Sequence, residues 1–213
     1  GPTDGLPPTR VDNPHVEHPE GALGLGVLGA GNYASAVFLP AIQKVGGIPR
    51  IGIASSTGLS AQNASRRFNF KYASSSEEEI LNDPNINVIA ILDRHEHHAR
   101  QVLEALQRGK HVYCEKPLAI RNEELEQITS ALRESSKQVA PPLLTVGFNR
   151  RFAPMAIRLK NFLEGRSEPL IAHYRVNAGY LPLSHWLHNA HQGGGRIIGE
   201  GCHFIDFLTF LIG

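Results

Sequence analysis

The chain has 213 residues, of which 41% are hydrophobic and 19% are charged, a balance typical of one large or one and a half ordinary globular domains. Its 21 Lys and Arg residues against 20 Asp and Glu leave a net charge of +1, which indicates no polyanionic partner such as nucleic acid. No apolar run is long enough to cross a bilayer, and two cysteines are too few for a disulfide-rich secreted scaffold.

Residues 1–22 are rich in Pro and Gly and predict an extended linker. This segment lacks the basic start and the apolar core of a secretory signal. With so few cysteines, that absence predicts a cytoplasmic protein without a membrane partner. The chain also lacks an initiator methionine, which indicates either a processed protein or a fragment of a larger parent chain.

Short apolar runs alternate with longer amphipathic runs from Leu23 onward. They predict strands within residues 23–29, 50–55, 71–73, 87–92, 111–115 and 143–148, and helices over residues 32–45, 59–68, 76–83, 95–109 and 122–137. Such alternation implies right-handed crossovers and predicts an α/β fold, a Rossmann-type doubly wound parallel sheet. Ser75 or Ser76 is predicted to cap the third helix, and Gly109 is predicted to close the fourth.

The pattern changes near Phe148. Residues 149–165 predict one more helix, residues 170–180 a longer alternating strand with one wet face, and the end of the chain a final helix. Because one strand cannot form a sheet, we expect residues 148–213 to be the start of an α+β substrate and oligomerisation domain that is either incomplete in this chain or completed by another chain. It would follow a dinucleotide-binding domain over residues 23–147.

A glycine-rich turn, Gly29-x-Gly31-x-x-Ala34, follows the first strand of this domain. Gly29 permits a tight turn, Gly31 leaves room for a pyrophosphate, and Ala34 lets helix and strand pack closely. The free N–H groups at the helix start, with Asn32 and Tyr33, are expected to face the phosphates. A glycine turn needed only for packing is the alternative, but the strand before it and the helix after it favour dinucleotide binding.

The type of dinucleotide is read at the end of the second strand, where a carboxylate would bind the ribose 2′-hydroxyl of NAD. This chain has Ser55, Ser56 and Thr57 there. Hydroxyl groups tolerate a 2′-phosphate, so the sequence leans toward NADP while leaving NAD open. Arg66 and Arg67 lie downstream, and we expect them to form a solvated helix face.

The tripeptide Glu115-Lys116-Pro117 ends the predicted strand at residues 111–115. Pro117 fixes its own backbone and disfavours a helical conformation for the residue before it, so Lys116 is expected to be held at the strand's end. An ammonium group there suits an oxidoreductase because hydride leaves a carbinol carbon only as the hydroxyl proton departs, and the ammonium stabilises the resulting negative charge. Glu115 would either orient the lysine or face away, and a surface lysine is the bland alternative.

Three motifs, "GAGNYA", "EKP" and "GGGRIIGEGCHFID", together resemble the Gfo/Idh/MocA oxidoreductase family over roughly residues 23–213. The segments "DRHEHHA", "GFNRRFAP" and "VNAGYLP" resemble the branch fused behind a zinc-type alcohol dehydrogenase-like domain. The resemblance implies an NAD(P)-dependent dehydrogenase acting on a hydroxyl or carbonyl of a sugar, cyclitol or related molecule. It also implies that Lys116 is catalytic, that His203 is an acid/base, and that the protein could be a homo-oligomer. The family often has Asp four residues before this histidine, where this chain has Gly199.

Further cofactor contacts are expected where the strand at residues 87–92 ends and where the two domains join. By resemblance these contacts are Asp93, Arg94, His95, His98, Glu115, Lys116, Asn149 and Arg150, although Asn149 and Arg150 could instead form a hinge. Near His203, Asp206 could orient the imidazole or bind solvent, and Trp186 is expected to pack.

Two other functions compete with the dehydrogenase. One is a non-catalytic dinucleotide sensor of the same fold, and the intact "EKP" motif and His203 speak against it. The other is a zinc site, built from His95 and His98 with Cys114, or from the histidines of the "SHWLHNAH" segment. Neither histidine group shows a convincing ligand set, so we expect no metal.

Overall fold

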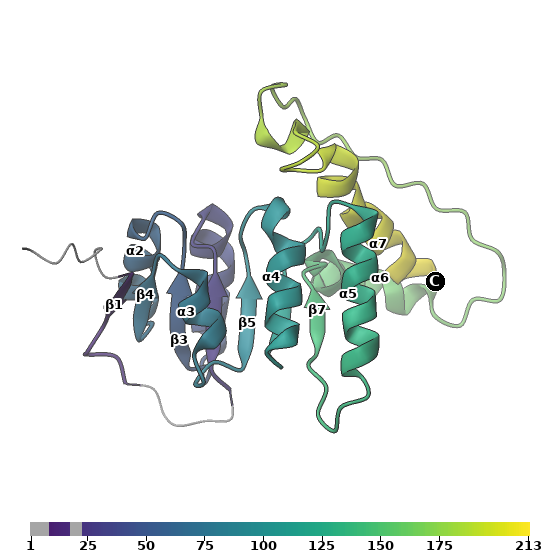
Figure 1. Ribbon diagram of the computed structural model, residues 1–213. Helices are drawn as coiled ribbons and strands as arrows, with labels where there is room; N and C mark the ends of the chain where they lie inside the picture. The colour runs from purple at the N-terminus through teal and green to yellow at the C-terminus, as the bar shows by residue number, and fades with distance from the viewer. Residues whose placement is uncertain (1–8, 18–22) are drawn as a thin grey trace, which may run out of the picture.

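The computed structural model describes residues 9–17 and 23–213, so most of the predicted linker lies outside the described residues. Its main body is one seven-stranded sheet in the order β1-β4-β3-β2-β5-β6-β7 (Figure 1). The strands are β1 Arg10–Asp12, β2 Leu25–Leu28, β3 Arg50–Ala54, β4 Tyr72–Ser74, β5 Val88–Ile91, β6 His111–Cys114 and β7 Leu144–Val146. All pairings are parallel except that of β1 with β4. The predicted doubly wound α/β fold is therefore confirmed.

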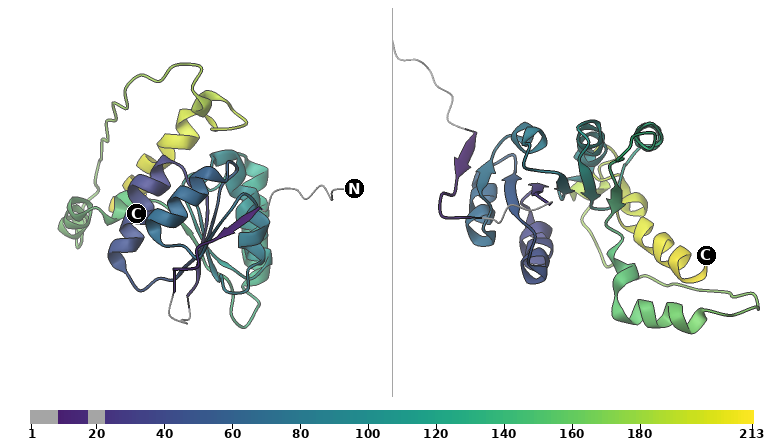
Figure 2. Two further views of the ribbon diagram at one scale, coloured as in Figure 1. Left: turned by 90° about the vertical axis from the view of Figure 1, so that its left-hand side faces the viewer. Right: turned by 90° about the horizontal axis from the view of Figure 1, so that it is seen from below.

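Helices cover both faces of this sheet (Figure 2). They are η1 Ala34–Phe38 with α1 Leu39–Val45, α2 Leu59–Phe68, α3 Glu77–Asn82, α4 His95–Gln107 and α5 Asn122–Ser135. One apolar core packs α1 and α2 against the sheet, and a second packs α3, α4 and α5 against the opposite face. The strand order reverses between β3 and β5 on either side of β2, which opens a crevice at the carboxyl ends of these strands.

The ends of two helices test the predicted caps. Gly109 closes α4 as expected, with a φ of +70° and an N–H that donates to the carbonyl of Leu106 at 3.0 Å. Ser76 occupies the N-cap position of α3, as predicted, but its side chain makes no capping bond. Ser74 Oγ instead accepts the N–H of Ser76 at 2.8 Å, so the hydroxyl that braces this turn comes from the end of β4.

Strand β1 was not predicted, and it lies within the segment expected to be a linker. It pairs antiparallel with β4 at the edge of the sheet, and its residues are exposed. The guanidinium of Arg10 lies over the ring of Tyr72, 3.7 Å from its centroid. Tyr72 in turn donates its hydroxyl proton to Asp83 at 2.9 Å, which connects β1 and β4 to the end of α3.

The C-terminal part adds η2 Asn149–Phe152, α6 Pro154–Leu163, η3 Trp186–His188, η4 Ile197–Gly201 and α7 Cys202–Ile212. The single helix predicted over residues 149–165 is interrupted at Ala153, whose ψ of 135° is the extended conformation that a following proline favours. The final helix forms as predicted but includes a π turn, η4.

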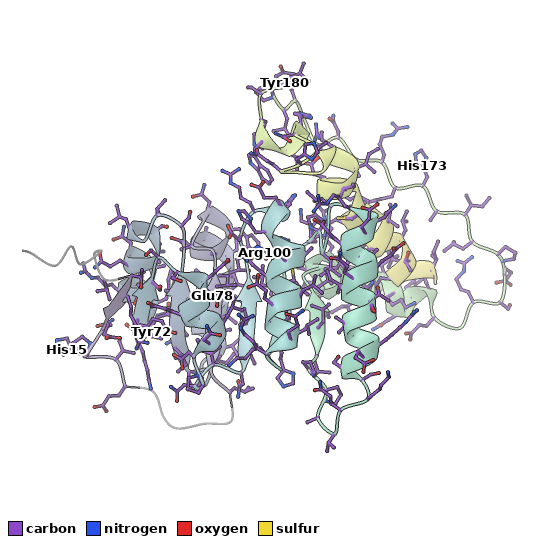
Figure 3. All side chains as sticks on the ribbon, in the orientation of Figure 1. His15, Tyr72, Glu78, Arg100, His173 and Tyr180 are labelled. Carbon is purple, nitrogen blue, oxygen red and sulfur yellow. The ribbon has the colours of Figure 1, made fainter. Side chains whose placement is uncertain are left out.

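The strand predicted over residues 170–180 is wrong. The segment is exposed, and none of its residues pairs with another strand in the part of the chain that the structure describes. Its alternating pattern suits a pleated surface, but a strand needs a partner for its backbone N–H and C=O groups. His173 and Tyr180 lie along this segment, away from the sheet (Figure 3).

No helix among the described residues is both long and apolar enough to cross a membrane.

Candidate functional site

A cleft of about 900 Å³ lies at the carboxyl ends of β2, β3, β5 and β6. Of the predicted site residues, its lining includes Gly29, Gly31, Asn32, Tyr33, Ser55, Ser56, Asp93, Arg94, His95, His98, Glu115, Lys116, Asn149 and His203. A second cavity of about 440 Å³ adjoins it, sharing Gly29, Ser55, Ser56 and Asp93, and continues toward α3 and α4. Residues drawn from nearly the whole length of the chain therefore meet at the crevice expected from the strand order.

The glycine turn lies where β2 enters this cleft. Gly29 has a φ of +99°, and a Cβ added to it would lie 2.7 Å from backbone atoms of Leu92 and Asp93. A Cβ on Gly31 would meet nothing within 4 Å, because this position opens into the cleft. Ala34 is fully buried against the sheet. Tight turn, open approach and close packing are thus each found at the residue predicted to need it.

A cluster of hydroxyl groups follows β3. The Oγ of Ser60 lies 2.6 Å from that of Ser55 and 2.8 Å from Oγ1 of Thr57. Thr57 and Ser60 line the cleft as well, which the sequence reading did not predict for Ser60. Arg66 and Arg67 are exposed on α2 and do not line either cavity, as expected for a solvated helix face.

Lys116 lies at the end of β6, where its peptide bond to Pro117 is cis. Its ammonium donates a hydrogen bond to the main-chain carbonyl of Gly199 at 2.7 Å. Glu115 does not hold this ammonium: its carboxylate is buried and accepts the hydroxyl proton of Tyr113 at 2.7 Å. Burial, reinforced by this carboxylate, raises the pKa of Tyr113 and also that of Tyr33. The carboxylate therefore belongs to a tyrosine cluster beneath the glycine turn.

The two histidines after β5 have different surroundings. Nδ1 of His95 lies 3.0 Å from the carbonyl of Gly193, and its ring meets Trp186 edge-on with centroids 4.8 Å apart. Burial lowers the pKa of His95 to about 4, so this side chain is neutral at pH 7. His98 is fully buried, with its ring nitrogens 2.7 Å and 3.0 Å from the carbonyls of Pro117 and Asp93. We interpret His98 as a brace for the cleft wall.

These contacts leave little for the alternative zinc hypothesis. Both nitrogens of His98 face carbonyl groups, and the buried Cys114 thiol donates to the carbonyl of Glu115 at 3.2 Å. No group of three or more His, Cys, Asp or Glu residues within the described ranges is arranged to hold a metal ion.

His203 enters the cleft from α7. Burial lowers its pKa to about 4, and the nearby charges of Lys116 and Arg150 act in the same direction. Nδ1 of His203 is buried and has no hydrogen-bond partner among the residues described. Both roles considered for Asp206 are wrong, because its carboxylate forms a two-pronged ion pair with Arg151, one bond of which measures 2.7 Å. That carboxylate joins α7 to η2 and does not orient the imidazole.

Two residues depart from their predicted places. Arg150 does not line the cleft: its guanidinium lies over the ring of Phe204, 4.9 Å from the centroid, and faces the hydroxyl of Tyr174. Trp186, which was expected to pack, lines the cleft next to His95. The guanidinium of Arg94 lies 5.1 Å from the centroid of the Trp186 ring. The only tryptophan of the chain, placed in a polar loop, was the one signal that could have found it.

Comparison with known proteins agrees with this geometry. The family model described as "Oxidoreductase family, NAD-binding Rossmann fold" matches residues 23–142. A levoglucosan dehydrogenase of Pseudarthrobacter phenanthrenivorans is 30% identical over 162 residues, covering 72% of this chain and 40% of the relative. A 1,5-anhydro-D-fructose reductase of Ensifer adhaerens is 31% identical over 191 residues, covering 88% of this chain and 56% of the relative.

Solved structures show the same fold. A levoglucosan dehydrogenase in complex with NADH and levoglucosan superposes with a TM-score of 0.73 at 28% identity, covering 90% of this chain and 54% of that one. A 3-ketoreductase from Actinomadura kijaniata has a TM-score of 0.74 at 23% identity, covering 90% of this chain and 57% of its own. The chain thus spans about half the length of the relatives it matches.

Proposed function

This chain belongs to the Gfo/Idh/MocA family of oxidoreductases, and from that premise we propose that it carries the coenzyme cleft of an NAD(P)-dependent dehydrogenase. The reaction would transfer a hydride between nicotinamide and a hydroxyl or carbonyl of a sugar, cyclitol or related small molecule. The observation that carries the proposal is the convergence of the glycine turn, Lys116 and His203 on one cleft. Residues 23–147 would bind the coenzyme, and residues 148–213 would begin the substrate side.

The cleft suits a dinucleotide in shape and in chemistry. The open approach at Gly31 leaves room for a pyrophosphate beside the N–H groups at the start of the following helix. The hydroxyl groups of Ser55 and Ser56 lie where a ribose would be recognised. The adjoining cavity extends the same crevice toward Arg100 and Gln101, and the combined space exceeds the volume of most small-ligand pockets.

The coenzyme, when bound, supplies the hydride acceptor or donor, and the protein handles the proton. The ammonium of Lys116, fixed at the strand's end, stabilises negative charge on the substrate oxygen as its proton leaves. His203 is neutral at pH 7, so its imidazole can accept a hydrogen bond from the substrate hydroxyl. The buried Glu115 carboxylate adds negative charge at the same end of the cleft, where an oxidised nicotinamide would carry a positive one.

Titration with NADH and NADPH, followed by coenzyme fluorescence, tests the binding half of the proposal. Turnover is then measured with NAD⁺ and NADP⁺ on a panel of cyclitols, anhydrosugars and hexoses. We expect Lys116→Ala to leave coenzyme affinity within about threefold and to lower kcat by about 10²- to 10⁴-fold, the usual range for losing a proton-handling group.

A chain that binds neither coenzyme would contradict the proposal. Turnover that survives in Lys116→Ala would contradict the role of the lysine alone. Tight binding without turnover in a protein that includes the remaining length of its relatives would instead favour a dinucleotide sensor.

A further inference from the structure

The ammonium of Lys116 has an unusual partner for a group with a proton to handle. Its hydrogen-bond acceptor is the carbonyl of Gly199, a neutral main-chain group. The carboxylates next in sequence to Lys116 and to Gly199 are engaged elsewhere: Glu115 accepts from Tyr113, and Glu200 accepts from Arg196, both at 2.7 Å. Among the described residues, Lys116 forms no ion pair.

A side chain at residue 199 would crowd its neighbours. Gly199 lies buried in the π turn η4, and an added Cβ would lie 2.5 Å from Cδ1 of Leu187 and 3.2 Å from Cε1 of His95. The carbonyl of Gly193 would be 3.3 Å away. Because residue 199 has no side chain, η4 can lie close to α4 and η3. In this position the main-chain carbonyl of Gly199 reaches the ammonium of Lys116.

We propose that the main-chain carbonyl of Gly199 is the positioning group for the Lys116 ammonium, and that a side chain at residue 199 would disturb this carbonyl by pressing on Leu187 and on the ring of His95. The inference rests on the proposed dehydrogenase function. A π turn is a frequent device at functional sites, and here it presents a carbonyl to a side chain that enters the cleft from another element.

A neutral acceptor has a chemical consequence. When a lysine paired with a carboxylate gives up its proton, an unpaired buried negative charge remains, which opposes the transfer. The carbonyl of Gly199 leaves no such charge. The titratable groups that face Lys116 from other elements are His95 of α4 with Cys202 and His203 of α7, and none of them is a carboxylate.

The test compares two glycines of the same π turn. Gly199→Ala introduces the clash, whereas Gly201→Ala is a matched control whose added Cβ would come no closer than 3.8 Å to any neighbour. The readout is the rate at which an amine-reactive reagent labels Lys116, followed by peptide mass spectrometry across pH, together with the NADH dissociation constant. Neither readout depends on turnover.

We expect Gly199→Ala to speed labelling of Lys116 at least fivefold, with other lysines unchanged, and Gly201→Ala to match the unsubstituted protein. Adding Leu187→Ala removes the clashing methyl group and should restore the slow labelling. In turnover assays Gly199→Ala should lower kcat with little change in KM, and the double variant should recover it. NADH affinity should remain within about threefold in all variants. Failure of the unsubstituted protein to bind NADH would contradict the proposed function and would leave this contact unaffected.

A second arm keeps the inference testable if Gly199→Ala alone does not fold. In the Leu187→Ala background, Gly199→Asp places a carboxylate beside the ammonium, and labelling of Lys116 at a fixed pH should slow about tenfold because the charged form is stabilised. Equal labelling of Gly199→Ala and Gly201→Ala, or an unchanged rate in the aspartate variant, would overturn the proposal.

Discussion

Ser55 is the first residue after β3, at the place where we propose that the adenosine ribose binds. Its hydroxyl is half-buried in the cleft and bonded to Ser60, whereas Arg66 and Arg67 point to solvent. Because no carboxylate follows β3, this strand end would not repel the 2′-phosphate of NADPH. Because neither Arg66 nor Arg67 faces the cleft, these arginines would not form an ion pair with that phosphate. The preference between the two coenzymes therefore depends on few charges, and one substitution should move it.

Ser55→Asp should weaken NADPH binding at least tenfold while NADH binding stays equal or improves. A carboxylate repels the 2′-phosphate and accepts hydrogen bonds from ribose hydroxyls. Parallel fluorescence titrations with NADH and NADPH measure the ratio. Arg66→Ala is the control and should leave that ratio unchanged, because its side chain lies outside the cleft. An NADPH affinity that survives Ser55→Asp would place ribose recognition elsewhere.

Single residues also show where sequence reading reaches its limit. The location of Lys116 follows from a strand end and a proline, which are both local signals, and it was predicted. The Arg151–Asp206 ion pair joins side chains 55 positions apart, and no local pattern announces it. The same holds for the Lys116–Gly199 contact: the sequence shows only that a family carboxylate is missing, and the packing around residue 199 supplies the replacement.

At the scale of elements, strands β2 to β7 and the helices that cover them were predicted because short apolar runs alternate regularly with amphipathic runs. β1 was missed because three exposed residues in a Pro-rich segment carry no apolar alternation. The strand at residues 170–180 was predicted in error for the opposite reason: its alternation is clear, but pairing is a property of two segments. A local pattern therefore does not predict a strand reliably unless the segment that pairs with it can also be predicted.

β1 offers a prediction at this scale. Val11→Pro removes a backbone donor from the ladder with β4 and should detach the strand, lowering the free energy of unfolding by about 1–2 kcal/mol. Thr9 would then release the N–H of Ser75, which it accepts at 2.8 Å. Because Ser75 lines the adjoining cavity, NADH affinity should also fall a few-fold.

Urea unfolding and NADH titration measure the two effects of Val11→Pro. Val11→Thr keeps the backbone donor and a β-branched side chain, so it should leave both quantities nearly unchanged. Loss of stability with full NADH affinity would show that β1 supports the sheet edge without shaping the cavity.

For the whole molecule, the stability of the fold should depend on pH because two histidines of the cleft are buried. His95 and His203 both have pKa values lowered to about 4 in the folded protein, against about 6.5 for an unperturbed histidine. Between about pH 4 and pH 6.5 the unfolded chain therefore binds more protons than the folded protein does. Their contribution to stability is complete above pH 6.5 and is lost as the pH falls toward 4.

We therefore expect the urea concentration at the unfolding midpoint to decrease when the pH is lowered from 7.0 to 5.0. The His95→Asn/His203→Asn double variant should show a smaller fall, because asparagine does not titrate. An equal fall in both proteins would mean that other groups govern acid sensitivity. The comparison needs only unfolding curves, so it is independent of coenzyme and substrate.

The bond between Lys116 and Gly199 closes a loop of 83 residues. Contacts of such separation form late on a folding pathway, since the entropy of closing the loop must be met before the contact stabilises anything. A nascent or refolding chain can thus form the glycine turn and the neighbouring strand ends while the lysine still has no acceptor. Maturation of this protein would then pass through a stage that captures dinucleotide before it is chemically competent.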